Sequence, residues 1–188
     1  MPTLNTYIQR TRRLLTDANA TYFSDAELTD CINVGRRRVS LDTGALRSLE
    51  TVNLTDGTET YALNTVTSKL TRAKDVLNII VVWGNQRVPL IWMPFTEFQA
   101  NMRVWANFQN MPAVWSNFGL PLGTVYIGPV PNDDYVSYWD ILYIPNDLMD
   151  NTTVDELDYP YDDPVCYYAA YTAKYRQQSY GEAALYEQ

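Results

Sequence analysis

The chain has 188 residues, of which 46% are hydrophobic and 19% charged, a composition that excludes disordered, collagen-like and fibrous proteins. Fourteen Lys and Arg against 22 Asp and Glu give a net charge of −8, which argues against general binding of nucleic acid. Because the sequence contains no histidine, Ser–His–Asp catalysis, Cys–His catalysis and histidine-containing metal sites are excluded.

Residues 1–48 predict a helical hairpin. Apolar side chains between residues 4 and 15 recur with the spacing of one helix face, and Thr3 precedes them as a possible N-cap. Ser24 and Glu27 have the spacing of a capping box, which begins a second helix that we expect to end by Gly44. The arginines of the first helix lie mostly off its apolar face: Arg10, Arg12 and Arg13.

Residues 49–145 change to the period of β-strands. One β-hairpin is predicted around the turn at 55–57 and a second around Gly84 and Asn85. A short helix is expected over residues 96–107, and further strands over 124–127 and 136–144. This part of the chain therefore predicts an inserted antiparallel β-rich domain of the sandwich or barrel type.

The C-terminal part is predicted to be an acidic loop over residues 146–162 and a helix over 163–188. Asp163 is a natural N-cap, and Pro164 suits the first helical position. One face of this helix is apolar enough to pack on the N-terminal hairpin, and a second stripe consists of tyrosines: Tyr167, Tyr171 and Tyr175. The fold class is therefore α+β, with one helical domain built from both ends of the chain.

No catalytic set, metal site or cofactor site is predicted. The carboxylates of residues 155–163 lack the alternating spacing of an EF-hand loop, so a solvated acidic loop is expected there. Asp133 and Asp134 indicate a turn rather than the carboxylate pair of a glycosidase. Cys31 and Cys166 are too few for a disulfide framework or a cysteine-rich zinc site, and both fall on predicted buried helix faces.

The chain is also not predicted to enter a membrane. The N-terminal residues lack the apolar region of a signal peptide, and the longest apolar run, residues 79–83, is far shorter than a membrane span. We therefore expect synthesis in a reducing cytoplasm. The aromatic excess of 15 Tyr, 5 Trp and 5 Phe favours strands and protein interfaces.

Charge is unevenly distributed along the sequence. Residues 133–163 contain ten acidic side chains and no basic one, so this segment either faces water or presents a negative field. The consecutive arginines Arg36, Arg37 and Arg38 have three interpretations: contact with phosphate, a solvated face with ion pairs, or an interface with an acidic partner.

The order of several motifs resembles the head-to-tail adaptor (connector) proteins of tailed bacteriophages, of the podovirus type. The resemblance begins with residues 22–28 (YFSDAEL), continues through Ile32 and Asn33 to the three arginines, and includes the strand motif at 61–63. It ends with the Gly-Pro-Val-Pro segment at 128–131 and with two Pro-containing motifs before the last helix, at 159–160 and 163–164.

This resemblance implies a structural role in the virion neck. Such adaptors form a ring, usually of twelve copies, that docks on the portal protein through the helical domain and the C-terminal segment. The β-rich domain is offered to the tail or nozzle protein. Genomic DNA would pass through the ring without being bound specifically. No membrane is expected among the partners. The resemblance implies two groups of site residues. Subunit or portal contacts would use Arg36, Arg37, Arg38, Tyr167, Tyr171 and Tyr175, and the channel would be faced by Asp155, Glu156 and Asp158.

Two other interpretations remain open. The first, within the same class of virion proteins, is another neck or tail-tube ring protein, which would bind tail components and not the portal. From a different class, a carbohydrate-binding module would need tryptophans exposed on one face of the β-rich domain: Trp92, Trp105, Trp115 or Trp139. An enzyme is not expected, because no acid–base or nucleophile set is visible.

Overall fold

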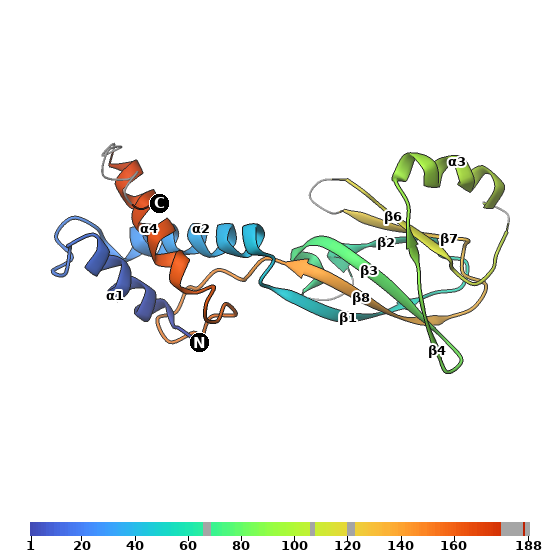
Figure 1. Cartoon of the computed structure of the whole chain (residues 1–188), viewed down its shortest axis with the longest axis horizontal. Coiled ribbons are helices and arrows are strands. Elements are labelled where there is room, and N and C mark those ends of the chain that lie inside the picture. The colour runs from blue at the N-terminus through green and yellow to red at the C-terminus, as the bar shows by residue number, and fades with distance from the viewer. Residues whose placement is uncertain (66–68, 106–107, 120–122, 178–185, 187–188) are drawn as a thin grey trace. The chain divides into compact units, whose positions relative to one another are not determined.

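The computed structural model describes residues 1–65, 69–105, 108–119, 123–177 and 186. The chain divides into two compact units, one made of Met1–Leu46 with Ile144–Gln188 and the other of Arg47–Tyr143 (Figure 1). The first unit is helical and the second is rich in strands, so the predicted α+β class is confirmed. We refer to them as the helical unit and the β unit.

The helical unit begins with α1 (Leu4–Leu14) and α2 (Asp25–Thr43). The predicted N-cap of α1 is confirmed, because the Thr3 side chain accepts a hydrogen bond from the Thr6 backbone N–H. The predicted capping box of Ser24 and Glu27 is also present, and Gly44 ends α2 in the left-handed region at φ 63°. Local capping chemistry therefore sets both ends of α2.

The last helix, α4 (Asp163–Arg176), contacts both α1 and α2. It begins one residue earlier than expected, with Asp162 in the N-cap position and Asp163 already helical, and the predicted residues 178–185 and 187–188 lie outside the described part of the chain. Val165, Cys166 and Ala169 are buried on its inner face. Cys31 is also buried, as expected from the sequence.

Between the β unit and α4, the chain from Ile144 to Asp162 belongs to the helical unit. The sequence predicted an acidic surface loop, and in the described residues the segment forms neither a helix nor a strand apart from an isolated bridge between Thr3 and Val154. It nevertheless buries Leu148, Asp155 and Leu157. We call it the acidic strap, because it carries core residues as well as charge.

The β unit contains two four-stranded sheets. The first has the order β1 (Arg47–Leu54), β8 (Tyr135–Tyr143), β3 (Ala73–Trp83) and β4 (Gln86–Pro89). The second has the order β2 (Thr60–Ala62), β7 (Thr124–Gly128), β6 (Val114–Phe118) and β5 (Ile91–Trp92). All neighbours are antiparallel except β5 and β6.

The hairpin predicted around Gly84 is confirmed, but the one predicted around residues 55–57 is wrong. β1 pairs along its whole length with β8, whereas β2 pairs with β7 in the other sheet. The turn therefore carries the chain from one sheet to the other. Strand β6 was missed by the sequence analysis, and β5 leaves the β3–β4 hairpin to pair with it.

Alternating inward-facing residues of the two sheets form the core of the β unit. Trp139 and Ile79 of the first sheet are fully buried, as are Val125 and Ile127 of the second. The ring of Tyr61 in β2 meets the ring of Trp139 edge-on at 6.2 Å, which links the two sheets.

The helix α3 (Phe95–Trp105) covers the second sheet, consistent with the helix predicted for residues 96–107, whose last two residues are outside the described chain. Phe98 is buried against Val114 and Tyr126.

Candidate interaction surfaces

A buried ion pair fastens the acidic strap to the helices. Arg36 of α2 donates from Nε to Asp155 Oδ2 at 2.9 Å, and its Nη2 pairs with the other carboxylate oxygen. Tyr7 donates to the same Oδ2 at 2.6 Å, and Asn33 accepts from Arg36 Nη1 at 3.0 Å. The pKa of Tyr7 is raised above its usual value, mainly by burial and in second place by the hydrogen bond to Asp155.

This geometry corrects the predictions for Arg36 and Asp155. The sequence predicts Arg36 at a partner interface and Asp155 in a channel, but their side chains are 1% and 0% exposed in the helical unit. The sequence pattern did not reveal the burial, because the partner of Arg36 lies 119 residues away. Both residues are therefore part of the core that positions the surfaces described below.

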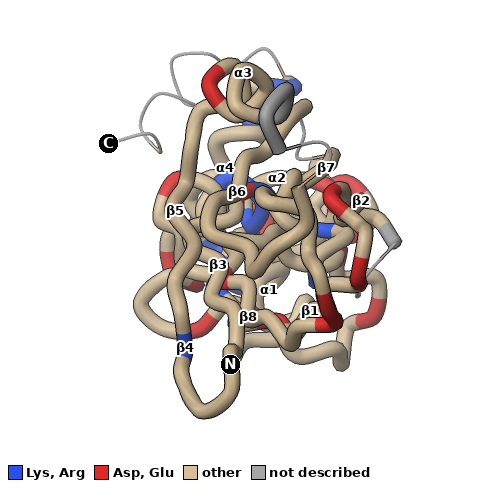
Figure 2. Tube along the Cα trace, turned by 90° about the vertical axis from the view of Figure 1, so that its right-hand side faces the viewer, with Lys and Arg blue, Asp and Glu red and all other residues tan. Residues whose placement is uncertain are grey.

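The negative charge of residues 133–163 is largely paired within each unit. Arg10 contacts Asp162 at 3.1 Å and Asp163 at 3.2 Å, and Arg47 pairs with Asp140 in the β unit. Asp147 and Asp155 of the same stretch pair with Arg37 and Arg36. Outside this stretch, acidic positions are scattered over the chain, and Figure 2 shows one on α3. The count of ten carboxylates thus overstates the field that this stretch presents.

The remaining two predicted channel residues lie on the strap. Asp158 is exposed, and its Oδ1 lies 3.6 Å from the N-terminal amine of Met1. Glu156 is half-buried. They remain candidates for facing a channel.

The other two predicted arginines lie on the outer side of α2. Arg37 is half-exposed, and its Nη1 is 3.8 Å from Asp147 of the strap. The Arg38 side chain is 62% exposed and its Nε donates to Asp42 at 2.7 Å, one helical turn on. Both guanidinium groups are accessible because their side chains are 43% and 62% exposed. Exposed ion pairs contribute little to stability, so a carboxylate of a partner can replace Asp147 or Asp42 at low cost.

The predicted tyrosine stripe is present on α4. Tyr167 and Tyr175 are 50% and 53% exposed. The ring of Tyr171 stacks on that of Tyr175 with centroids 5.9 Å apart, at an interplanar angle of 27°. Three aromatic side chains at i+4 spacing thus lie along one side of α4, with Tyr171 partly buried, and we call them the tyrosine stripe.

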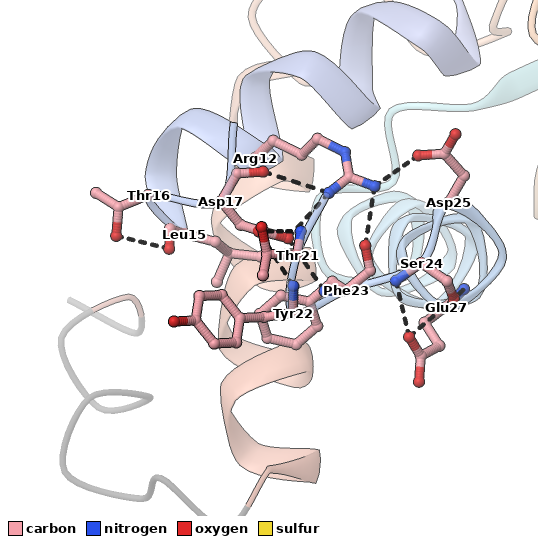
Figure 3. Close-up of polar contacts among 10 residues, drawn as sticks. All are labelled: Arg12, Leu15, Thr16, Asp17, Thr21, Tyr22, Phe23, Ser24, Asp25 and Glu27. Atoms are coloured by element: carbon pink, nitrogen blue, oxygen red, sulfur yellow. Dashed lines mark hydrogen bonds and ion pairs between the residues drawn. The ribbon is translucent and has the colours of Figure 1, made fainter. Parts of the chain in front are cut away.

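The loop between α1 and α2, residues 15–24, is organised by an ion pair that the sequence analysis missed. Arg12, predicted to lie mostly off the buried face, is 4% exposed, and its Nη1 donates to Asp17 at 3.0 Å (Figure 3). Its Nη2 donates to the Phe23 carbonyl at 2.9 Å and to Asp25 at 2.6 Å.

Asp17 also accepts hydrogen bonds from the backbone of the same loop. The donors are the N–H groups of Thr21 at 2.8 Å, Tyr22 at 3.2 Å and Phe23 at 3.1 Å. Burial alone would raise the pKa of Asp17, but these three hydrogen bonds and the charge of Arg12 lower it below the usual value. The carboxylate is therefore the centre of the loop, and the only sign of this geometry in the sequence is an Arg and an Asp five residues apart.

Two of the four tryptophans named for carbohydrate binding are not available for stacking on a sugar. Trp115 and Trp139 are buried in the core of the β unit, which corrects that alternative for these two residues. Trp92 is exposed, and its Nε1 donates to Asn117 at 3.4 Å. The side chain of Trp105 lies outside the described part of the structure.

Over the described residues, no group of three or more Cys, Asp or Glu side chains is arranged to hold a metal ion. Over the same residues, no helix is both long and apolar enough to cross a membrane.

Comparison with known proteins gives a match over nearly the whole chain. The family model described as SU10 adaptor protein matches residues 2–188. The search of curated proteins found no match.

Proposed function

The chain belongs to the SU10 adaptor protein family, a family of phage head-to-tail adaptors, and from this premise we propose that it forms a ring of twelve copies joining the portal to the tail. Because it belongs to this family, the chain is a structural protein of a bacteriophage. The ring, its copy number and its partners are our proposal, and the number twelve follows from the family resemblance alone.

The observation that carries this proposal is the tyrosine stripe. Tyr167 and Tyr175 leave about half of their side chains in water on the outside of a well-packed helix. Tyrosine is enriched at protein interfaces, where it supplies a large rigid contact area. We therefore assign the tyrosine stripe to the contact with the portal protein, and Arg37 and Arg38 to the contact between subunits.

The β unit would then face the tail or nozzle protein. DNA would pass through the ring without specific binding, and Glu156 and Asp158 would face the channel. Carboxylates there would repel phosphates and keep the DNA from adhering.

Native mass spectrometry tests the proposal. The purified chain is measured alone and after mixing with the portal ring of the same virus. We expect close to twelve added copies on each portal ring. A chain that adds no copies to the portal but assembles with tail components would overturn portal docking and support the neck or tail-tube alternative.

A further inference from the structure

The loop between α1 and α2 holds a large aromatic side chain in water on a fixed backbone. Tyr22 is 74% exposed, although its backbone N–H is bound to the buried carboxylate of Asp17. The neighbouring Phe23 is buried and anchors the other side of the loop. Figure 3 shows the Tyr22 ring directed away from the Arg12–Asp17 pair.

The same loop contains two residues in an unfavourable backbone conformation. Thr16 has φ 53° and Ala20 has φ 54°, in the left-handed region that residues other than glycine adopt rarely. Such a conformation persists only where the surrounding structure holds it in place. In this loop the hydrogen bonds made by Arg12 and Asp17 hold the backbone. A loop ordered in advance loses little conformational entropy when it binds a partner.

The end of α2 next to this loop carries three acidic side chains, and the charge of Arg176 of α4 acts on one of them, Glu27. Asp25 and Glu27 are exposed, but each already has a role, the first with Arg12 and the second in the capping box. Asp30, one turn further on, is exposed, and within the described part of the chain its carboxylate makes no hydrogen bond or ion pair. We call Tyr22, Asp25, Glu27 and Asp30 the loop surface.

The outer side of α2 has the complementary chemistry further along the helix. Val34, Arg38 and Leu41 follow each other at i, i+4 and i+7, so they share one face. Val34 and Leu41 are exposed apolar side chains, and Arg37 and Arg38 lie between them along the helix, with their guanidinium groups against Asp147 and Asp42. We call these four residues the basic surface. Guanidinium groups stack on aromatic rings and pair with carboxylates, so this surface suits a tyrosine surrounded by acidic residues.

The two surfaces cannot meet within one chain. Asp25 and Arg38 are thirteen residues apart on the same α-helix, which places them about 20 Å apart. Two loop surfaces would repel each other through Glu27 and Asp30, for which the described residues show no ion pair, and this disfavours a symmetric pair of loop surfaces. The charges of Arg37 and Arg38 are balanced in part by Asp147 and Asp42 of the same chain, so the basic surface attracts carboxylates in competition with these two. Pairing the loop surface of one copy with the basic surface of another is heterologous, and a heterologous contact closes into a ring when its rotation allows.

We propose that the loop surface of each copy docks on the basic surface of the next copy, with Tyr22 packing between Val34, Leu41 and the guanidinium groups. The partner of this contact is a second copy of the same chain, because the acidic loop surface and the arginines of the basic surface are complementary in charge. This inference rests on the proposed ring and identifies the contact that builds it.

Charge reversal tests the contact on the full-length chain. Asp30→Arg changes the loop surface alone, and Arg38→Glu changes the basic surface alone. We expect each variant to need at least tenfold more protein than the wild type to assemble, alone or on the portal ring.

Mixing the two variants in equal amounts should restore assembly. The altered loop surface of the Asp30→Arg variant then meets the altered basic surface of the Arg38→Glu variant, with the two charges exchanged. The reciprocal contact joins two unaltered surfaces and is therefore that of the wild type. Native mass spectrometry should find both variants in equal numbers in the assembled species.

Tyr22→Ala should weaken assembly to a similar degree, while Tyr159→Ala, which alters an exposed tyrosine of the strap, serves as the matched control. Far-UV circular dichroism checks that each variant is folded. A wild-type ring whose variants all assemble at the wild-type concentration would overturn this inference and leave the proposed function intact. A wild-type chain that stays monomeric with and without the portal would overturn both.

Discussion

Arg36 and Asp155 form a buried ion pair although 119 residues separate them. The pair joins α2 to the acidic strap, and Tyr7 of α1 donates to the same carboxylate. Three segments of the helical unit therefore meet at one carboxylate, and the fold of this unit depends on it.

Removing one member of this pair should be costly. In the Arg36→Ala variant, Asp155 would remain as a buried charge without its partner, so we expect the free energy of unfolding to fall by about 3–5 kcal/mol. The double variant Arg36→Ala/Asp155→Ala should lose less than the sum of the two single variants. Urea denaturation followed by circular dichroism at 222 nm measures this. Additive losses would contradict the assigned coupling.

The position of the tryptophans allows the two units to be followed separately. All five lie between residues 83 and 139, within the β unit. Tryptophan fluorescence therefore reports unfolding of the β unit, and the signal at 222 nm reports mainly the helical unit. The Arg36→Ala change should shift the transition at 222 nm, which follows the helical unit, to lower urea. The fluorescence transition of the β unit should stay near its wild-type midpoint. Equal shifts of both would mean that the units unfold together.

Gly35 allows α4 to approach α2 closely. A Cβ at this position would lie 3.0 Å from the Val165 carbonyl oxygen and 3.1 Å from Tyr168 Cβ. Backbone atoms of a packed helix cannot move aside cheaply, so Gly35→Ala should destabilise the helical unit by about 1–3 kcal/mol despite the better helix propensity of alanine. Val34→Ala, on the exposed side of the same helix, is the control and should change stability by less than about 0.5 kcal/mol. Urea denaturation midpoints of the two variants measure this difference in stability. An unchanged midpoint for Gly35→Ala would contradict the close packing of α2 and α4.

Much of the fold could be predicted from sequence because its signals are local. The capping box at Ser24 and the glycine at 44 set the ends of α2, and the Gly84–Asn85 turn specifies the β3–β4 hairpin. Strand pairing over long distances has no such signal. The turn before β2 resembles a hairpin turn, yet β1 takes β8 as its neighbour, more than 80 residues away.

The candidate surfaces were predicted less completely, for the same reason. The i+4 spacing of the tyrosines on α4 is visible in the sequence, and their exposure agrees with an outer stripe. The burial of Arg12 and Arg36 was not visible, because arginine is usually a surface residue and its carboxylate partners lie on other segments. The loop surface around Tyr22 depends on the first of these pairs and so was missed.

High pH should weaken the helical unit through Cys166. Burial raises the pKa of this thiol from 9.0 to about 11. The unfolded chain therefore loses the thiol proton from about pH 9, while the folded chain keeps it until about pH 11. Since the folded state binds the proton more tightly, the free energy of unfolding should fall with rising pH in this window, by about 1.4 kcal/mol per unit.

The raised pKa values of Cys31 and Tyr7 act in the same direction, so the Cys166→Ala variant isolates the contribution of one thiol. Its stability should fall less steeply between pH 9 and about pH 11 than that of the wild type, whatever its absolute value. Urea denaturation at a series of pH values gives both slopes, and parallel slopes would rule out the assignment to Cys166.

The tyrosine stripe should contribute directly to binding the portal ring. Tyr167 lies on the outside of α4 and is half-exposed, so Tyr167→Ala removes contact area without opening a cavity in the helical unit. A buried tyrosine at an interface commonly contributes more than about 1 kcal/mol, so we expect the apparent affinity for the portal ring to fall about tenfold. Tyr159→Ala removes an equally large but more exposed ring from the strap and should leave the affinity unchanged. Titration of the portal ring with each variant, read by native mass spectrometry, compares them. If both variants bind like the wild type while circular dichroism shows them folded, the portal contact must lie on another face of the helical unit.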